Sequence, residues 1–258
     1  MDEHRPHQVD LDFDTTVSPL SPPPEFTRLC ADYGLAFDDG DLERLGRHLA
    51  LLYAANQVVN LTAVRDVNEA WIRHVFDSLT LIPLIVEVEA GSRIADVGTG
   101  GGMPGIPLAI TLPEYHVTLI EATGKKVQFL RKVAEVLDLK NVEVVQGRSE
   151  TMGQETSRWR ETFDVVCARA LGPLNVALEL TVPLMKPGGR ALLTKGARAA
   201  EELEHAALAL RELKAVHAGT VETPTGRIVV VTKHSRTPRL YPRRDGEPKR
   251  APIGGRLP

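Results

Sequence analysis

Apolar residues recur at helical spacing through the first third of the chain. Leu45, Leu49 and Leu52, for example, lie three to four residues apart. A further helix of the same kind is expected behind Asn68, a residue type suited to N-capping. The pattern predicts a helical subdomain of two or three helices over residues 26–90.

From Gly91 onward, short apolar runs alternate with helical segments, and this order is typical of a parallel sheet covered on both faces. The last two runs are separated only by the turn 223–226, so these strands must be antiparallel. Residues 91–234 are therefore expected to form an α/β domain whose mostly parallel sheet ends in a reversed strand. The expected strands are 94–97, 117–121, 142–146, 164–168, 191–194, 215–222 and 228–232.

A glycine-rich run, DVGTGGGMPG at residues 96–105, joins the first expected strand to an apolar helix start. A strand followed by such a turn builds a nucleotide-sized pocket at the carboxyl end of the strand. Gly100, Gly102 and Gly105 also match the dinucleotide pattern G-x-G-x-x-G. An NAD(P)-linked oxidoreductase is therefore one interpretation.

Asp96 helps to decide whether the ligand is a dinucleotide or S-adenosylmethionine. Its carboxylate lies where a pyrophosphate would approach the turn, and at contact distance two like charges repel by about 4 kcal/mol at an effective dielectric near 20. S-adenosylmethionine carries an ammonium and a sulfonium and no phosphate. Asp96 therefore favours S-adenosylmethionine as the cofactor of a methyltransferase.

Polar residues at other strand ends are candidates for the same pocket. Glu121 ends the second strand and could accept the ribose hydroxyls; a solvent-exposed carboxylate is the alternative. Ser149 and Glu150 follow the third strand, where they could meet the adenine or cap a helix. Arg169 ends the fourth strand and could contact the donor carboxylate or a substrate phosphate, or form a surface salt bridge.

Several motifs are missing from the chain. The Asn-Pro-Pro-Tyr or Asp-Pro-Pro-Tyr motif of exocyclic-amine methyltransferases does not follow the fourth strand, which argues against methylation of an adenine or cytosine amino group. Cys167 lies inside an apolar strand, where cysteine is usually a buried small hydrophobe rather than a nucleophile. With only two cysteines, neither a structural zinc site nor a disulfide framework is expected, and no metal is assigned.

The two ends of the chain differ in charge. Residues 1–25 hold six acidic residues and one arginine, whereas residues 234–258 hold seven basic and two acidic residues. We expect residues 1–25 to be a disordered, proline-rich tail and residues 235–258 to be a flexible basic tail, either a phosphate-contacting arm or a solvated extension. No run of about 20 apolar residues and no signal peptide is found, so a cytoplasmic protein without membrane contact is expected.

Eight segments, taken in order along the chain, form a specific pattern. They are Asn60-Leu61-Thr62-Ala63, Arg73-His74 with Asp77-Ser78-Leu79, Asp96 to Leu108, Gly124-Lys125-Lys126 with Phe129-Leu130, Arg148 with Glu150, Ala168-Arg169-Ala170, Lys195-Gly196 and Tyr241-Pro242-Arg243. In these segments the chain resembles the RsmG (GidB) family of bacterial methyltransferases of small-subunit ribosomal RNA. The resemblance implies a Rossmann-like class I methyltransferase that uses S-adenosylmethionine to methylate N7 of one guanine in a loop of the decoding region of 16S rRNA.

The resemblance also implies the site residues. The family's donor contacts correspond to Gly98, Met103, Glu121, the pair Ser149-Glu150, and Arg169. The family often has a larger apolar residue at position 103 and Val or Ala at position 149; a backbone contact at 149 would make the second difference harmless.

The implied chemistry needs no general base. N7 of guanine has a free lone pair, so holding the reactants close together suffices, and no catalytic base is assigned. Arg169 and Lys195 are candidates for positioning the substrate. The expected partner is 16S rRNA or the small subunit, and a monomer is expected. A methyltransferase acting on another RNA, a protein or a small molecule remains an alternative.

Overall fold

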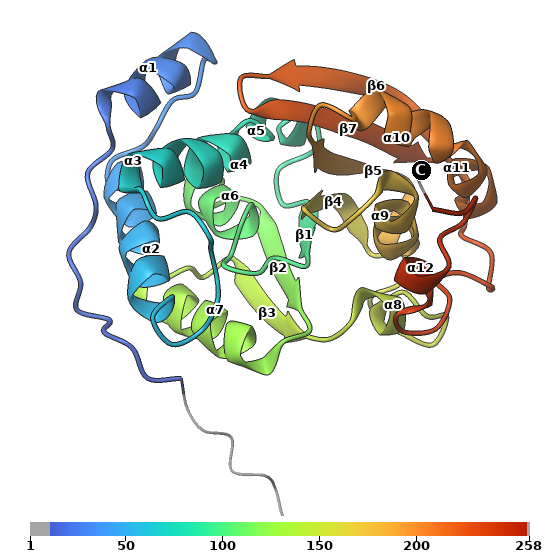
Figure 1. The fold of residues 1–258 in the computed structure, drawn as a ribbon, viewed down its shortest axis with the longest axis horizontal. Coiled ribbons are helices and arrows are strands. Elements are labelled where there is room, and N and C mark those ends of the chain that lie inside the picture. The colour runs from blue at the N-terminus through green and yellow to red at the C-terminus, as the bar shows by residue number, and fades with distance from the viewer. Residues whose placement is uncertain (1–10, 257–258) are drawn as a thin grey trace, which may run out of the picture.

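The computed structural model describes residues 11–256, so the first ten residues of the expected acidic tail lie outside the described part. Within it, seven strands form one sheet in the order β3-β2-β1-β4-β5-β7-β6 (Figure 1). The strands are β1 Arg93–Val97, β2 His116–Glu121, β3 Val142–Gln146, β4 Phe163–Arg169, β5 Met185–Lys195, β6 Ala215–Thr223 and β7 Gly226–Lys233.

The direction of the strands confirms the predicted sheet. Strands β1 to β5 pair in parallel, whereas β7 pairs antiparallel with both β5 and β6. Two reversals return β6 to the direction of β5, so the turn between β6 and β7 lies at the same edge as the carboxyl ends of the parallel strands. In such a sheet, ligands bind at this edge.

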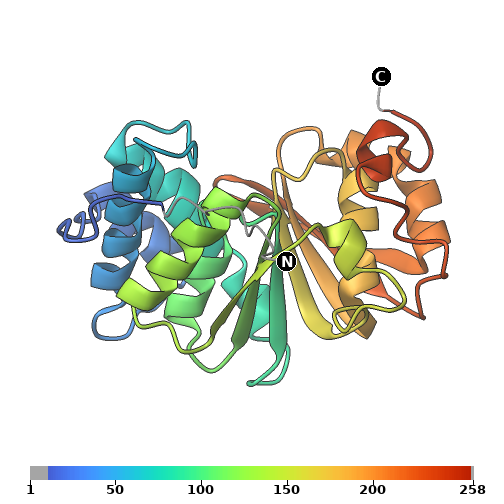
Figure 2. The ribbon, with the colours of Figure 1, turned by 90° about the horizontal axis from the view of Figure 1, so that it is seen from below.

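Helices cover both faces of the sheet (Figure 2). Successive strand residues face opposite sides, so Ile94 packs into one core and Ala95 into the other. The first core includes α1 to α7, and the second includes α9 to α11. The helical elements are α1 Pro24–Asp32, α2 Asp41–Ala55, α3 Val67–Ala70, η1 Trp71–Phe76, α4 Asp77–Leu79, α5 Ile82–Ile85, α6 Gly105–Thr111, α7 Gly124–Val136, α8 Ser149–Met152, α9 Leu174–Thr181, η2 Val182–Leu184, α10 Ala199–His205, α11 Ala207–Leu213 and α12 Glu247–Arg250.

The helices over residues 26–90 share their core with the sheet. Phe26 and Trp71 are buried, with ring centroids 4.6 Å apart, in the same cluster as Ile106 of α6 and Leu119 of β2. The predicted helical subdomain is therefore continuous with the sheet domain in its packing. The helix expected behind Asn68 begins slightly earlier, because the side chain of Asp66 accepts the cap hydrogen bond from the Glu69 N–H at 2.8 Å.

The part of the proline-rich start that the structure describes lies against α2. The Leu20 N–H donates to the Gly46 carbonyl at 3.1 Å. A Cβ at position 46 would collide with the Leu20 carbonyl, so glycine permits this close approach.

The C-terminal segment, residues 235–256, packs across α8 and α9, whereas the sequence predicts a flexible tail there. Its main anchor is Arg243, whose guanidinium and backbone N–H donate to the fully buried carboxylate of Glu179 on α9 at 2.6–3.2 Å. Arg160 adds hydrogen bonds to the carbonyls of Thr237 (2.6 Å) and Tyr241 (2.8 Å). Hydrogen bonds to buried polar side chains thus anchor a segment whose charge-rich composition predicts flexibility.

No helix in residues 11–256 is long and apolar enough to span a membrane.

Candidate active site

The glycine run forms a tight turn at the carboxyl end of β1. Gly98 and Gly102 have φ values of +71° and +92°, in the region that side chains disfavour. A Cβ at Gly102 would lie 2.6 Å from Cγ1 of Ile106. Glycine is therefore required for both conformation and space, and the bare backbone of the turn faces a cavity.

This cavity, called here the turn cavity, has a volume of about 140 Å³. Residues of the turn form one wall, and side chains from α2, the loop 61–62, η1 and the end of β4 form the others. The lining residues are Leu52, Leu61, Thr62, His74, Gly98, Thr99, Gly100, Gly101, Met103, Arg169 and Ala170. Four predicted site residues line it: Gly98, Gly100, Met103 and Arg169.

Asp96 lies beneath the turn and is not among the lining residues. Its side chain is fully buried, and Oδ2 accepts a hydrogen bond from the Gly105 N–H at 2.8 Å. Burial raises the pKa of Asp96 to about 6, although the Gly105 hydrogen bond opposes the shift. The sequence predicts a carboxylate that faces the ligand; in the structure it fastens the start of α6 to β1.

Glu121 supports the turn from the neighbouring strand. Its Oε2 accepts from the Gly100 N–H at 3.1 Å, and Oε1 accepts from the Thr123 N–H at 2.8 Å. The side chain is nearly buried, with 8% of the residue surface exposed. Glu121 thus links the glycine turn to the start of α7, while its predicted ribose contact stays a prediction.

Ser149 and Glu150 begin α8 and direct their side chains into the fold. The Ser149 hydroxyl donates to the Leu180 carbonyl, and Oε1 of Glu150 accepts from the Gly246 N–H at 2.9 Å. Both residues are buried. Any contact of Ser149 with a ligand is therefore expected through its backbone.

Arg169 connects the end of β4 to η1. Its Nη1 donates to the Arg73 carbonyl at 2.6 Å and to Oδ2 of Asp77 at 3.2 Å. Because η1 is a π-helix, the Asp77 N–H donates to Ile72, five residues back, instead of to Arg73 as in an α-helix. The π-helix thus leaves the Arg73 carbonyl available to the guanidinium.

His74 completes the contacts of Arg169. Its Nδ1 accepts from Nη2 of Arg169 at 3.3 Å, because a guanidinium can only donate. Nε2 then carries the ring proton and donates to Oγ1 of Thr62 at 2.7 Å. Burial, followed by the charge of Arg169, lowers the pKa of His74 to about 4, so the imidazole is neutral at pH 7.

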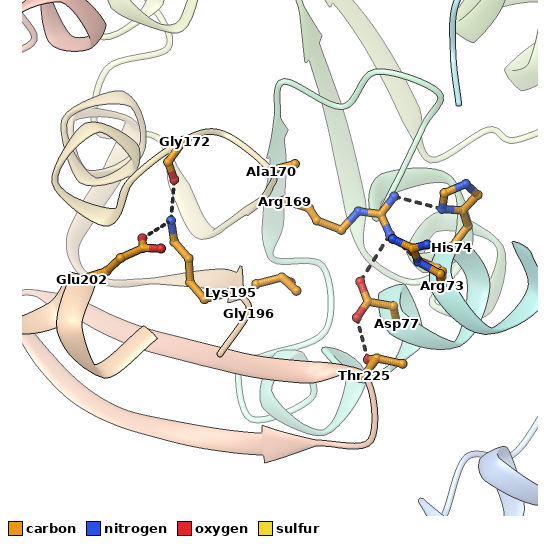
Figure 3. A pocket seen from close by; sticks show the side chains of 11 residues that line it. Arg73, His74, Asp77, Arg169, Ala170, Gly172, Lys195, Gly196, Glu202 and Thr225 are labelled. Atoms are coloured by element: carbon orange, nitrogen blue, oxygen red, sulfur yellow. Dashed lines mark hydrogen bonds and ion pairs between the residues drawn. The ribbon is translucent and has the colours of Figure 1, made fainter. Parts of the chain in front are cut away.

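A second cavity, called here the polar cavity, adjoins the turn cavity and has a volume of about 570 Å³ (Figure 3). His74, Arg169 and Ala170 line both cavities, so the two meet there. The remaining lining residues come from η1, α4, the loop after β4, the end of β5, α10 and the β6–β7 turn. They are Arg73, Asp77, Gly172, Thr194, Lys195, Gly196, Glu202 and Thr225.

The charged side chains of the polar cavity are paired with one another, except for Arg73, which pairs with Glu69 outside the lining. Lys195 donates to the Gly172 carbonyl at 2.5 Å and lies 2.8 Å from a carboxylate oxygen of Glu202. Asp77 binds Arg169 through one oxygen and accepts from Oγ1 of Thr225 through the other, at 2.6 Å. Figure 3 shows two groups of contacts, with Lys195, Gly172 and Glu202 at one side of the cavity and Arg169, His74, Asp77 and Thr225 at the other. The cavity is therefore polar, and each of its charged side chains has an oppositely charged partner.

Comparison with known proteins identifies the family. The family model described as "rRNA small subunit methyltransferase G" (GidB) matches residues 41–228. The chain belongs to the GidB family. It is 46% identical to Ribosomal RNA small subunit methyltransferase G of Sorangium cellulosum, over 88% of this chain and 94% of that protein. The protein of the same name from Leuconostoc citreum is 40% identical, over 86% and 95% of the two chains.

Solved structures show the same fold at low sequence identity. A Klebsiella pneumoniae protein described as an O-methyltransferase aligns with a TM-score of 0.53 and 18% identity, covering 82% of this chain and 96% of its own. A Methanococcus maripaludis protein described as an S-adenosyl-L-methionine-dependent methyltransferase gives 0.52 and 14%, covering 65% and 90%. The predicted class I methyltransferase fold is confirmed, and the dinucleotide interpretation of the glycine run is disfavoured.

Five of the eight segments that resemble the GidB family contribute residues to these two cavities. The structure brings Arg73, His74 and Asp77 to Arg169. It also brings Thr225, which the sequence leaves unassigned, to Asp77. Lys195 lies at the same edge, but its side chain is only 8% exposed. Cys167 is buried in β4, and burial raises the pKa of its thiol well above the ordinary value, which supports the structural interpretation of this cysteine.

Proposed function

We propose that this protein transfers the methyl group of S-adenosylmethionine to N7 of a guanine in a loop of the decoding region of 16S rRNA. The observation that carries the proposal is the meeting of the turn cavity and the polar cavity at His74 and Arg169. A donor in the first and a base in the second would be neighbours. Membership of the GidB family supports the methyltransferase activity and the ribosomal RNA substrate.

The turn cavity suits one part of a methyl donor, since its volume of about 140 Å³ is below the roughly 300–1,000 Å³ of a complete small-molecule pocket. Gly98, Gly100 and Gly101 leave much of its turn wall without Cβ atoms, and a Cβ at Gly98 would lie 2.9 Å from Leu171. We assign Gly98, Gly100, Met103 and Arg169 to the donor from their place in the lining, with Glu121 and the backbone of Ser149 at the nucleoside end. Asp96 contributes by fixing the turn. When bound, S-adenosylmethionine supplies a methyl group on a positively charged sulfur.

The polar cavity is suited to position a base rather than to move a proton. Both ring nitrogens of His74 and both carboxylate oxygens of Asp77 are already engaged. Guanine N7 needs no deprotonation before it attacks a methyl group, so a site without a free base is adequate. Catalysis then rests on holding the two reactants at reacting distance. A loop suits this chemistry because its bases can turn out of the stack.

Transfer of radiolabelled methyl tests this function directly. The protein and labelled S-adenosylmethionine would be incubated separately with 30S subunits, protein-free 16S rRNA, tRNA and bulk protein. We expect label in 16S rRNA, and nucleoside analysis should identify it as 7-methylguanosine. Reduction followed by aniline cleavage would map it to the decoding region.

The possible results separate the parts of the proposal. Label in rRNA on another atom would overturn the N7 assignment, and label only in tRNA or protein would overturn the substrate. Binding of NADH without binding of S-adenosylmethionine in calorimetry would overturn the donor.

A further inference from the structure

A third cavity lies on the other side of the loop that follows β4. It has a volume of about 450 Å³, and Ala170 and Gly172 line both this cavity and the polar cavity. Its outer wall is formed by the C-terminal segment, with Lys249 of α12 and Arg256 among the lining residues. None of its lining residues in the described chain is acidic. We call it the C-terminal cavity.

The C-terminal cavity and the polar cavity differ in how their cations are paired. In the polar cavity, Arg73, Arg169 and Lys195 each lie within 3.2 Å of a carboxylate oxygen. Within residues 11–256, neither Lys249 nor Arg256 has a carboxylate within ion-pair distance; Arg256 donates only to a backbone carbonyl at 3.3 Å. Of these two cavities, the C-terminal cavity is therefore the one whose cations are available to an external anion.

Buried side chains hold this basic wall in place. Asn175 of α9 is 1% exposed, and its Nδ2 donates to the carbonyls of Ile253 at 2.8 Å and Gly255 at 2.9 Å. Earlier in the segment, Arg243 binds Glu179 of the same helix. The backbone that carries Lys249 and Arg256 is therefore fixed before any ligand binds, which reduces the entropy lost on binding.

We propose that the C-terminal cavity binds the phosphodiester backbone of the RNA next to the target guanine. The proposal rests on the proposed function, because it takes the polar cavity as the site of the base. The loop 170–173 then separates two parts of one ligand. The neutral base lies in the polar cavity, whose charges are paired, and the phosphodiester backbone lies in the C-terminal cavity, whose cations are free. Lys249 and Arg256 each contact one phosphate of this backbone, and their charges are opposite to those of the phosphates.

The double substitution Lys249→Gln with Arg256→Gln tests this assignment. Both residues are exposed, so the variant should fold, and thermal unfolding would verify it. The control is Lys132→Gln with Lys140→Gln, which removes the same charge. Lys140 is 83% exposed and precedes β3, at the opposite edge of the sheet. The measurements are steady-state methylation of 30S subunits, calorimetry with S-adenosylmethionine, and fluorescence anisotropy with a labelled RNA hairpin of the decoding region at several salt concentrations.

We expect the double variant to raise KM for 30S subunits about tenfold, with kcat within about twofold and donor affinity unchanged. For two lost contacts to single-stranded phosphates, the slope of log Kd for the hairpin against log salt should fall by about 1.4. An unchanged KM and salt slope, or changes equal to those of the control, would overturn the subsite. A loss of donor affinity would also overturn it.

Failure of the proposed function gives a different result. If the wild-type protein places no label in 16S rRNA, the activity is refuted. The anisotropy measurement does not depend on turnover, so it still decides the subsite: equal hairpin affinity and salt slope in wild type and double variant would refute it as well.

Discussion

The turn cavity and the polar cavity adjoin each other but are built in different ways. One wall of the turn cavity is the backbone of consecutive residues 98–101, shaped by glycines with positive φ. The polar cavity is formed by residues of η1, α4, β4, β5, α10 and the β6–β7 turn, which ion pairs and hydrogen bonds hold together. The first is determined locally and the second by tertiary contacts. Substitutions in the turn should therefore strongly weaken donor binding. Single substitutions in the polar cavity should have smaller effects on kcat or KM.

The largest effect is expected from Gly98→Asp. Position 98 has φ +71°, and a Cβ there would lie 2.9 Å from Leu171, so a side chain would distort the turn and extend into the cavity. We expect calorimetry to show at least 100-fold weaker binding of S-adenosylmethionine, about 2.8 kcal/mol. The matched control is Gly188→Asp, at φ +85° in open space. Equal losses in both variants, or retained affinity at position 98, would contradict a donor site at this turn.

A moderate effect is expected from Arg169→Lys. Lysine keeps the charge but cannot contact the Arg73 carbonyl, Asp77 and His74 together, as the planar guanidinium does. We expect kcat for 30S methylation to fall about tenfold, measured in steady-state assays. Arg158→Lys, at a side chain that is 75% exposed, serves as the control. A kcat equal to that of the control would show that the position of Arg169 does not limit the reaction.

A smaller effect is expected from Thr225→Val. The substitution removes the 2.6 Å hydrogen bond to Asp77 and frees the hairpin turn from α4. We expect KM for 30S subunits to rise about threefold while donor affinity is unchanged, because Thr225 lines only the polar cavity. Thr220→Val on the exposed edge strand β6 is the control. A parallel loss of donor affinity would show that the two cavities are not independent.

His74 is expected to cause no change in rate between pH 6 and 8. Its pKa is lowered to about 4, so the imidazole stays neutral throughout this range. Asp96, whose pKa is raised to about 6, titrates at the lower end of this range, so the rate should be constant only above about pH 7. As the pH falls toward 4, protonation of His74 would place a positive charge beside Arg169, and the rate should decline further. The test is kcat against pH on 30S subunits. A decline centred near pH 6.5 that disappears in His74→Gln would indicate an ordinary histidine acting as a base.

The same contrast explains what the sequence could and could not predict. The strands were predictable because each is a short apolar run, and the glycine turn because its requirements lie within ten residues. The partners of Arg169 were not, since the Arg73 carbonyl is 96 positions away and is available only because η1 is a π-helix. The charge of Asp96 predicts that it faces the ligand, but charge alone does not reveal that the side chain is buried.

The packing of the C-terminal segment could not be predicted for a related reason. Its composition is typical of a solvated tail, yet its anchors, Asn175 and Glu179, lie in the otherwise apolar helix α9. Two buried polar residues in an apolar helix are a signal, because buried polar groups need partners. The sequence does not show which distant segment supplies them.

The reversed strand β7 has a consequence for how substrate preference can change. Because β6 runs in the direction of β5, the polar cavity is bordered by a hairpin turn, the kind of element that best tolerates added residues. Residues inserted at Pro224 or Thr225 would reshape the wall that faces the acceptor. The glycine turn lies on β1, two strands further into the sheet than β5, and would keep its structure. In this fold, the preference for the methyl acceptor can therefore change while the donor site keeps its structure.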